Sequence, residues 1–167
     1  MNSKVELLAE QLTFCREQTL KTASGVPEGA RLLQLRPGKG HALWLLGHVA
    51  NTANVVMLQW TLNGESVTPK GFGKKFAPDF GGGDPVTGDA ADYPAWDVVI
   101  DTYGKAMSAA IDSVKKLTDA DLPAPVPGRI PDPLRQYFSS VGKALSIMVL
   151  HDSYHRGQIG LLGALDK

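Results

Sequence analysis

The stretch VGKALSIMVLHDSYHRGQIGLLGAL, residues 141–165, decides how the fold of this chain is interpreted. Apolar residues and histidines recur in it every three or four positions, which is the period of one helix face. Ser139 or Ser140 is suited to cap its start, because a serine hydroxyl accepts a hydrogen bond from a free amide of the first turn. A helix is therefore predicted over 141–165. Its inner face comprises Ala144, Met148, His151, His155, Gln158 and Leu162, widened by Leu145, Ile159 and Leu161.

Three further segments show helical periodicity, over about residues 4–21, 40–62 and 94–117. Ser3 and Glu6 form an S-x-x-E capping box at the start of the first segment. The predicted inner faces carry Val5, Leu8, Leu12 and Cys15 in the first segment, Trp44, His48, Asn51, Val55 and Leu58 in the second, and Ile100, Tyr103, Met107, Ala110, Val114 and Leu117 in the third.

The expected fold is all-α, because no segment shows the alternation of a half-buried strand. Four amphipathic helices in a chain of 167 residues predict a single four-helix bundle domain over residues 1–167. The connections over 63–92 and 118–139 are long, and loops of this length are often functional. They also permit a crossover, so that the second and third helices could run parallel.

Composition excludes several classes of protein. Lys plus Arg and Asp plus Glu both number 17, so the charge gives no case for a nucleic-acid partner. No stretch approaches the roughly 20 apolar residues that span a bilayer, and the first residues do not resemble a signal peptide. The one cysteine, Cys15, excludes an internal disulfide and is expected to be a buried structural thiol. A cytoplasmic location is expected.

Three of the four histidines fall on predicted inner faces. His151 and His155 are four residues apart, so their imidazoles lie on one helix face and can converge on one ion. His48 has the same kind of position on the second helix, and three inward imidazoles would leave coordination positions open, as in catalytic metal sites. The alternative is that all three are hydrogen-bonded core histidines, and the residues alone leave both interpretations open.

Several neighbours are candidates for supporting roles. Gln158 and Asn51 each follow a histidine by three residues and could orient it through a hydrogen bond. Tyr154 could offer its hydroxyl to a substrate, although ordinary packing competes with that role. Asp152 is turned about 100° from the histidine face, which favours contact with a neighbour or with solvent. His41 lies about 10.5 Å along the helix from His48, too far for one ion, so it is expected near the helix start and not as a ligand.

No carboxylate is placed to act as a catalytic base, and the catalytic residues stay undefined. The zinc-protease motif H-E-x-x-H has glutamate directly after its first histidine, where this chain has Asp152. The chain has no Glu-x-x-His sequence, so a di-iron carboxylate site lacks its ligands.

Two motifs resemble one known family. HDSYHRGQIGLL (151–162) is similar to the C-terminal helix motif of the DinB/YfiT-like superfamily, in which H-x-x-x-H is followed closely by G-Q. WLLGHVANTANVV (44–56) resembles the second helix of that superfamily, which carries a single histidine. The resemblance implies an up-down-down-up four-helix bundle, often homodimeric, with a divalent metal held by His48, His151 and His155. It also implies metal-dependent transferases of low-molecular-weight thiols, or hydrolases.

The resulting hypothesis is a metal-dependent enzyme acting on a small-molecule substrate, with a low-molecular-weight thiol as candidate co-substrate. Thiol transfer is favoured over hydrolysis, because a metal-bound thiolate needs no base at the moment of attack. One divalent transition metal is expected: zinc or nickel first, with iron or manganese also compatible. The alternative is a non-catalytic metal-binding protein that acts as a stress or sensor module, or through a partner.

Overall fold

The computed structural model describes residues 3–78 and 81–165, and all regular structure in these residues is helical. The all-α prediction is therefore confirmed. The long helices are α1 (Lys4–Ser24), α2 (Ala42–Thr52) with its continuation η2 (Ala53–Thr61), α4 (Trp96–Val114) and α5 (Val141–Ala164). The connections contain α3 (Phe72–Phe76) and the 3₁₀ turns η1 (Glu28–Ala30), η4 (Ala90–Asp92) and η5 (Asp132–Leu134).

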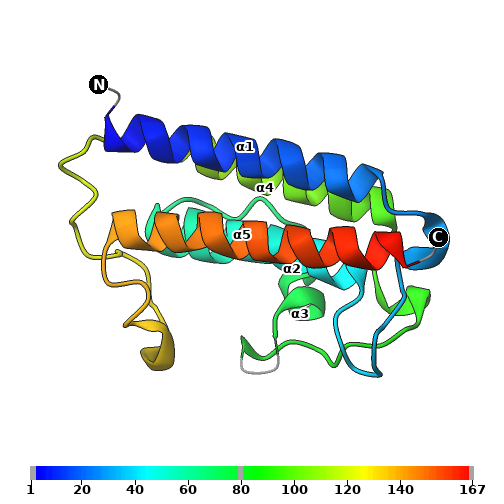
Figure 1. The fold of residues 1–167 in the computed structure, drawn as a ribbon. Coiled ribbons are helices and arrows are strands. Elements are labelled where there is room, and N and C mark those ends of the chain that lie inside the picture. The colour runs from blue at the N-terminus through cyan, green and yellow to red at the C-terminus, as the bar shows by residue number, and fades with distance from the viewer. Residues whose placement is uncertain (1–2, 79–80, 166–167) are drawn as a thin grey trace.

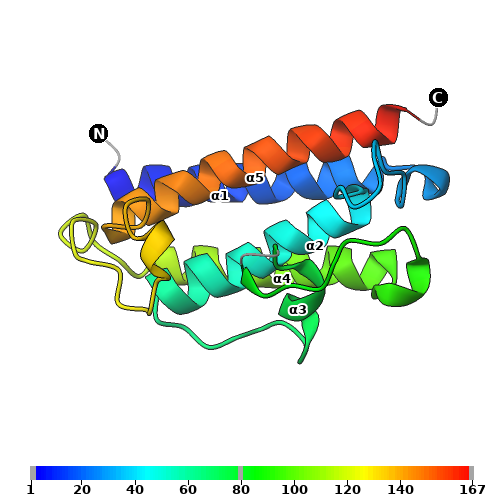
Figure 2. The ribbon, with the colours of Figure 1, turned by 90° about the horizontal axis from the view of Figure 1, so that it is seen from below.

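The long helices pack around one shared core. α1 contacts α4 and α5, and α2 contacts the same two helices from the other side. In Figure 1 the colour gradient shows α1 and α5 running from left to right, and α2 and α4 running in the opposite direction. Figure 2, from below, shows α3 beside α2, outside the layer of long helices. The short α3 was not expected from the sequence.

Local capping explains where two of the helices begin. Ser3 N donates to Glu6 Oε2 at 2.7 Å, and Glu6 N donates to Ser3 Oγ at 3.1 Å, so the capping box of α1 is complete in both directions. Ser140 Oγ accepts from Lys143 N at the start of α5. Both predicted helix starts are confirmed. α1 extends to Ser24, three residues beyond its predicted end.

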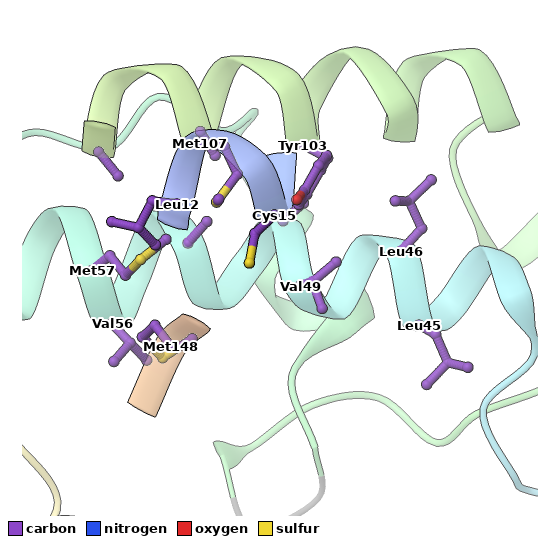
Figure 3. Close-up of a cluster of buried hydrophobic side chains, with 14 of the residues drawn as sticks. Leu12, Cys15, Leu45, Leu46, Val49, Val56, Met57, Tyr103, Met107 and Met148 are labelled. Carbon is purple, nitrogen blue, oxygen red and sulfur yellow. The ribbon is translucent and has the colours of Figure 1, made fainter. Parts of the chain in front are cut away.

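The core is built from apolar side chains of all four long helices. Figure 3 shows Leu12 and Cys15 of α1 close to Met57 of η2, Met107 of α4 and Met148 of α5. The thiol of Cys15 is buried, as expected, and lies 3.6 Å from Ser153 Oγ. Burial is the main cause that raises the pKa of this thiol.

Beyond Asn51, the predicted inner face of the second helix is wrong at Val55, whereas the predicted Leu58 is buried. Residues 53–61 form a π-helix, in which Leu62 N donates to Met57 O, five residues back. The wider turn rotates the later residues, so Val56 and Met57 are buried while Val55 is only half-buried. Single π turns are uncommon and frequently lie at functional sites.

One other predicted inner-face position is wrong, and two more are only partly buried where they pack against the core. Leu161 is 58% exposed, because it lies toward the outer side of α5. Ile100 and Leu117 are half-buried at the edges of the core, and Leu117 lies beyond the end of α4. Within the described ranges, no helix combines the length and apolar character needed to cross a membrane.

Candidate metal centre

The structure brings His48, His151 and His155 together. Each offers one ring nitrogen, and these nitrogens all lie within 4.8 Å of one another. His151 and His155 project from successive turns of α5, and His48 reaches them from α2, which packs against α5. His48 is 7% exposed, while His151 and His155 are half-buried. The group is therefore positioned to bind a metal ion from the inner side of the α2–α5 contact.

The distance between two of the nitrogens fits a shared ion. His48 Nε2 and His151 Nε2 lie 3.2 Å apart. Two nitrogens at this separation, each about 2.0–2.1 Å from one metal, subtend an angle of about 100° at the ion. That angle lies between the ideal values for octahedral and tetrahedral coordination.

Hydrogen bonds fix the tautomer of two of the three rings. His48 Nδ1 lies 3.0 Å from Phe76 O, and His155 Nδ1 lies 2.7 Å from Gln158 Oε1. Both partners are carbonyl oxygens that only accept, so each Nδ1 carries the hydrogen and donates it. The lone pair of each ring is then on Nε2, the nitrogen available to an ion. Metal-binding histidines commonly show this arrangement.

The ring of His151 has a different hydrogen-bond pattern from those of His48 and His155. His151 Nδ1 is buried and has no hydrogen-bond partner. Because His48 Nε2 is an acceptor, the 3.2 Å contact requires His151 to donate from its own Nε2. To serve as a ligand through Nε2, the neutral His151 ring would carry its hydrogen on Nδ1 instead.

Burial keeps the three rings neutral. It is the main cause that lowers the pKa of His48 to about 4 and that of His151 to about 3. The neighbouring histidines lower the pKa of His151 further, because like charges in close contact disfavour protonation. The pKa of His155 is also lowered, chiefly by burial. Neutral imidazole is the form that binds a metal, so the donor set fits a transition-metal ion near pH 7.

The three candidate supporting residues, Gln158, Tyr154 and Asn51, differ in their contacts and in their exposure to solvent. Gln158 accepts from His155 Nδ1 and donates from Nε2 to Tyr154 Oη at 3.2 Å. The Tyr154 ring is 63% exposed and lies against His155, with ring centroids 5.1 Å apart. Asn51 is buried, and its Oδ1 has no hydrogen-bond partner. That oxygen would lie 2.9 Å from a Cβ placed on Gly73, which sets it beside α3.

Asp152 and His41 do not join the histidine group. Asp152 is buried and accepts hydrogen bonds from Thr19 Oγ1 and Tyr103 Oη, each at 2.7 Å. Asp152 was expected to contact either a neighbouring residue or solvent, and the structure shows that it contacts neighbouring side chains. His41 precedes α2 as its N-cap: its Nδ1 accepts from Trp44 N, and its Nε2 lies 3.0 Å from Thr87 O.

Two contacts fix His48, and the sequence indicated only the first, through the i, i+4 spacing of Trp44 and His48. The Trp44 ring stacks on it with centroids 5.0 Å apart and planes inclined by 6°. The carbonyl of Phe76 binds its Nδ1, but a backbone oxygen has no signature in the residue pattern. The only available signal was FGKKF (72–76), with two phenylalanines at helical spacing inside a long predicted loop.

In the described residues, the regular structure is helical and three histidines from two helices converge. These features define a class of helical proteins that can bind a single metal ion. A family model described as the DinB superfamily matches residues 11–159. The chain belongs to the DinB superfamily, as its two histidine motifs indicated. A comparison with curated proteins gave no match.

Proposed function

We propose that this protein binds one divalent transition metal through Nε2 of His48, His151 and His155. The observation that carries the proposal is the tautomer pattern: His48 and His155 donate from Nδ1 and present a lone pair at Nε2. Both rings therefore keep an unprotonated nitrogen, in a group whose ring nitrogens lie within 4.8 Å of one another. The up-down-down-up arrangement of a single DinB-like domain is consistent with the helix directions in Figure 1.

Three neutral imidazoles suit zinc or nickel, and iron or manganese are compatible choices. A bound ion of this kind supplies Lewis acidity and lowers the pKa of a water or thiol that occupies its open position. Phe76 O would hold the ring of His48 in place, and Gln158 Oε1 would hold that of His155. Tyr154 would present its hydroxyl near the exposed side of the centre.

The proposed activity is that of a metal-dependent transferase of a low-molecular-weight thiol, with hydrolysis as the second reaction. Among the described residues, the group of potential ligands contains no carboxylate that could serve as a base for water. A thiol whose pKa a bound ion would lower would need no such base, so transfer of a thiol fits this site better than hydrolysis. The proposed setting is the cytoplasm, and the proposed assembly is a homodimer.

The test is elemental analysis of tag-free protein prepared without chelator. Wild type is expected to hold about one transition metal per chain, and His48→Ala, His151→Ala and His155→Ala are each expected to hold almost none. His41→Asn is the matched control, because it alters a buried histidine of the same helix region but keeps a capping side chain. Metal loss in His41→Asn with retention in His48→Ala would refute the ligand set.

The rival function is a metal-binding protein without catalysis. The low exposure of His48 favours it, because a ligand buried this deeply leaves access only from the side of His151 and His155. The zinc- and nickel-loaded protein should be assayed for thiol transfer to a small electrophile and for hydrolysis of small esters and amides. Activity that is lost in His151→Ala supports the enzyme. Tight stoichiometric metal with neither activity would favour the sensor or interaction protein.

A further inference from the structure

The short helix α3 lies outside the bundle yet reaches the histidine group through one backbone atom. It docks onto α2 at Gly47, the residue directly before His48. A Cβ on Gly47 would overlap Cδ1 and Cε1 of the Phe76 ring. The Phe76 ring therefore occupies the space that any larger residue at position 47 would need. Because Phe76 is 0% exposed, its ring is enclosed by protein atoms and does not face solvent.

A second contact strengthens the docking. Phe72 is also buried, and the centroids of the Phe72 and Phe76 rings lie 4.6 Å apart. Farther along α2, Gly73 lies so close to Asn51 that a Cβ would come within 2.9 Å of its Oδ1. Small residues on both helices thus allow a close approach of the two backbones.

The loop that follows α3 holds it from the outside. Asp84 N donates to Lys74 O at 2.8 Å, and the Asp84 carboxylate pairs with Lys74 Nζ at 3.5 Å and Lys75 Nζ at 3.2 Å. α3 is therefore fixed by buried rings on one side and by a hydrogen-bonded loop on the other.

Docking places the end of α3 where His48 needs an acceptor. The last carbonyls of a helix have no partner within the helix, and Phe76 is the last residue of α3. Its oxygen accepts from His48 Nδ1 at 3.0 Å, which forces the lone pair onto Nε2, 3.2 Å from His151 Nε2. Trp44 fixes the plane of the ring by stacking, but stacking does not choose the tautomer.

We infer that α3 is a positioning element for the histidine centre: by docking against Gly47, it uses the Phe76 carbonyl to set the tautomer and orientation of His48. The tautomer is a property of the metal-free protein. The consequence for metal affinity rests on the proposed function. Loss of a hydrogen bond of this kind to a metal-binding histidine typically weakens metal binding about 10–100-fold.

The test is Gly47→Ala, with Gly104→Ala as the matched control. Both glycines lie inside long helices, so both substitutions gain a similar helix propensity. A Cβ on Gly104 meets nothing within 4 Å, whereas one on Gly47 meets Phe76. If Gly47→Ala fails to fold, Phe76→Ala replaces it, because that variant removes the anchoring ring and keeps the backbone carbonyl.

The first readout is the ¹H–¹⁵N correlation of imidazole nitrogens in metal-free protein near pH 8, where the rings are neutral. Wild type and Gly104→Ala are expected to show His48 as a single Nδ1–H tautomer, and Gly47→Ala as a mixture of tautomers. The second readout is zinc affinity by chelator competition, expected to fall about 10–100-fold in Gly47→Ala only.

The two readouts separate failure of this inference from failure of the proposed function. If wild type binds no metal, the proposed function fails, and the tautomer measurement still decides the role of α3. A Gly47→Ala protein that keeps the pure Nδ1–H signal would overturn the inference. So would a tautomer mixture accompanied by unchanged zinc affinity, because the carbonyl contact would then not control the site.

Discussion

Tyr103 Oη donates a 2.7 Å hydrogen bond to Asp152 Oδ2, which holds a carboxylate in the core one residue after His151. Thr19 Oγ1 donates to the other oxygen of the same carboxylate, also at 2.7 Å. The three residues come from α4, α5 and α1, so the network ties together three of the long helices. Burial is the main cause that raises the pKa of Asp152, and the two hydroxyls oppose that shift.

Removing a member of this network should destabilise the fold. Tyr103→Phe leaves Asp152 with one donor and is expected to lower the free energy of unfolding by about 1–3 kcal/mol. Asp152→Ala leaves two buried hydroxyls unpaired, so its cost should be larger than that of Asp152→Asn, which keeps an acceptor. Urea unfolding of the metal-free proteins measures the differences.

Asp101→Ala is the control for this series. Asp101 also lies in a long helix, but it pairs with Lys105 on the surface, with 60% of its side chain exposed. Exposed pairs of this kind contribute little, so its unfolding midpoint should hardly move. Equal midpoints for Asp152→Ala and Asp101→Ala would contradict a stabilising role for the buried network.

The metal-free protein should lose stability as the pH falls below about 6.5. Burial lowers the pKa of His48 to about 4 in the folded state, whereas the unfolded chain has the ordinary value. Between these values the unfolded chain binds a proton that the folded chain excludes, so lowering the pH favours unfolding. For His48 alone the effect is at most about 3 kcal/mol, present in full above about pH 6.5 and lost toward about pH 4.

Asp152 acts with the opposite sign, because its pKa is raised by folding. The comparison that isolates the histidine is therefore between wild type and His48→Gln, with chelator present. The stability of His48→Gln should depend less steeply on pH between about 4 and about 6.5. Parallel curves for the two proteins would show that protonation of His48 is not coupled to unfolding.

The sequence predicted the parts of the site that depend on helix spacing. Four residues along one helix return to the same face, so His151 and His155 had to project together, and His48 was aligned with the inner face of its own helix. The remaining parts depend on backbone geometry and on packing between helices. The π turn at 53–61 moved Val55 off the core, and no residue type announces such a turn.

Contacts between elements far apart in the chain could not be predicted from the sequence either. The partner of His48 Nδ1 is a peptide oxygen, and every residue has one. The partners of Asp152 lie 133 and 49 residues away in the chain, on helices whose mutual packing the sequence did not specify. The spacing fixed which way Asp152 turned, away from the histidines, but not what it would meet there.

His41 should matter for folding and not for metal content. Its Nδ1 accepts from Trp44 N as the cap of α2. His41→Ala is expected to lower the free energy of unfolding by about 1 kcal/mol through loss of the cap, and more if the Thr87 contact also contributes. His41→Asn, which can cap, should recover part of this loss. Thermal unfolding and elemental analysis of both variants check the prediction, and reduced metal in either would contradict it.

Gln158 should control how tightly His155 binds a metal. Its Oε1 accepts the Nδ1 hydrogen of His155 at 2.7 Å, which keeps Nε2 free for the ion. Gln158→Met has similar size but no acceptor, so zinc affinity is expected to fall about 10–100-fold. Gln158→Glu keeps the acceptor and adds negative charge next to the ring, so it should bind zinc at least as tightly as wild type.

Tyr154→Phe completes this series. It keeps the ring against His155 and removes only the hydroxyl that accepts from Gln158 Nε2. Its effect on zinc affinity should be smaller than that of Gln158→Met, because His155 keeps its own acceptor. Chelator competition ranks the four proteins in one assay. If Gln158→Met bound zinc as tightly as wild type, the Nδ1 hydrogen bond would not orient His155, and the ring would owe its position to packing on α5 alone.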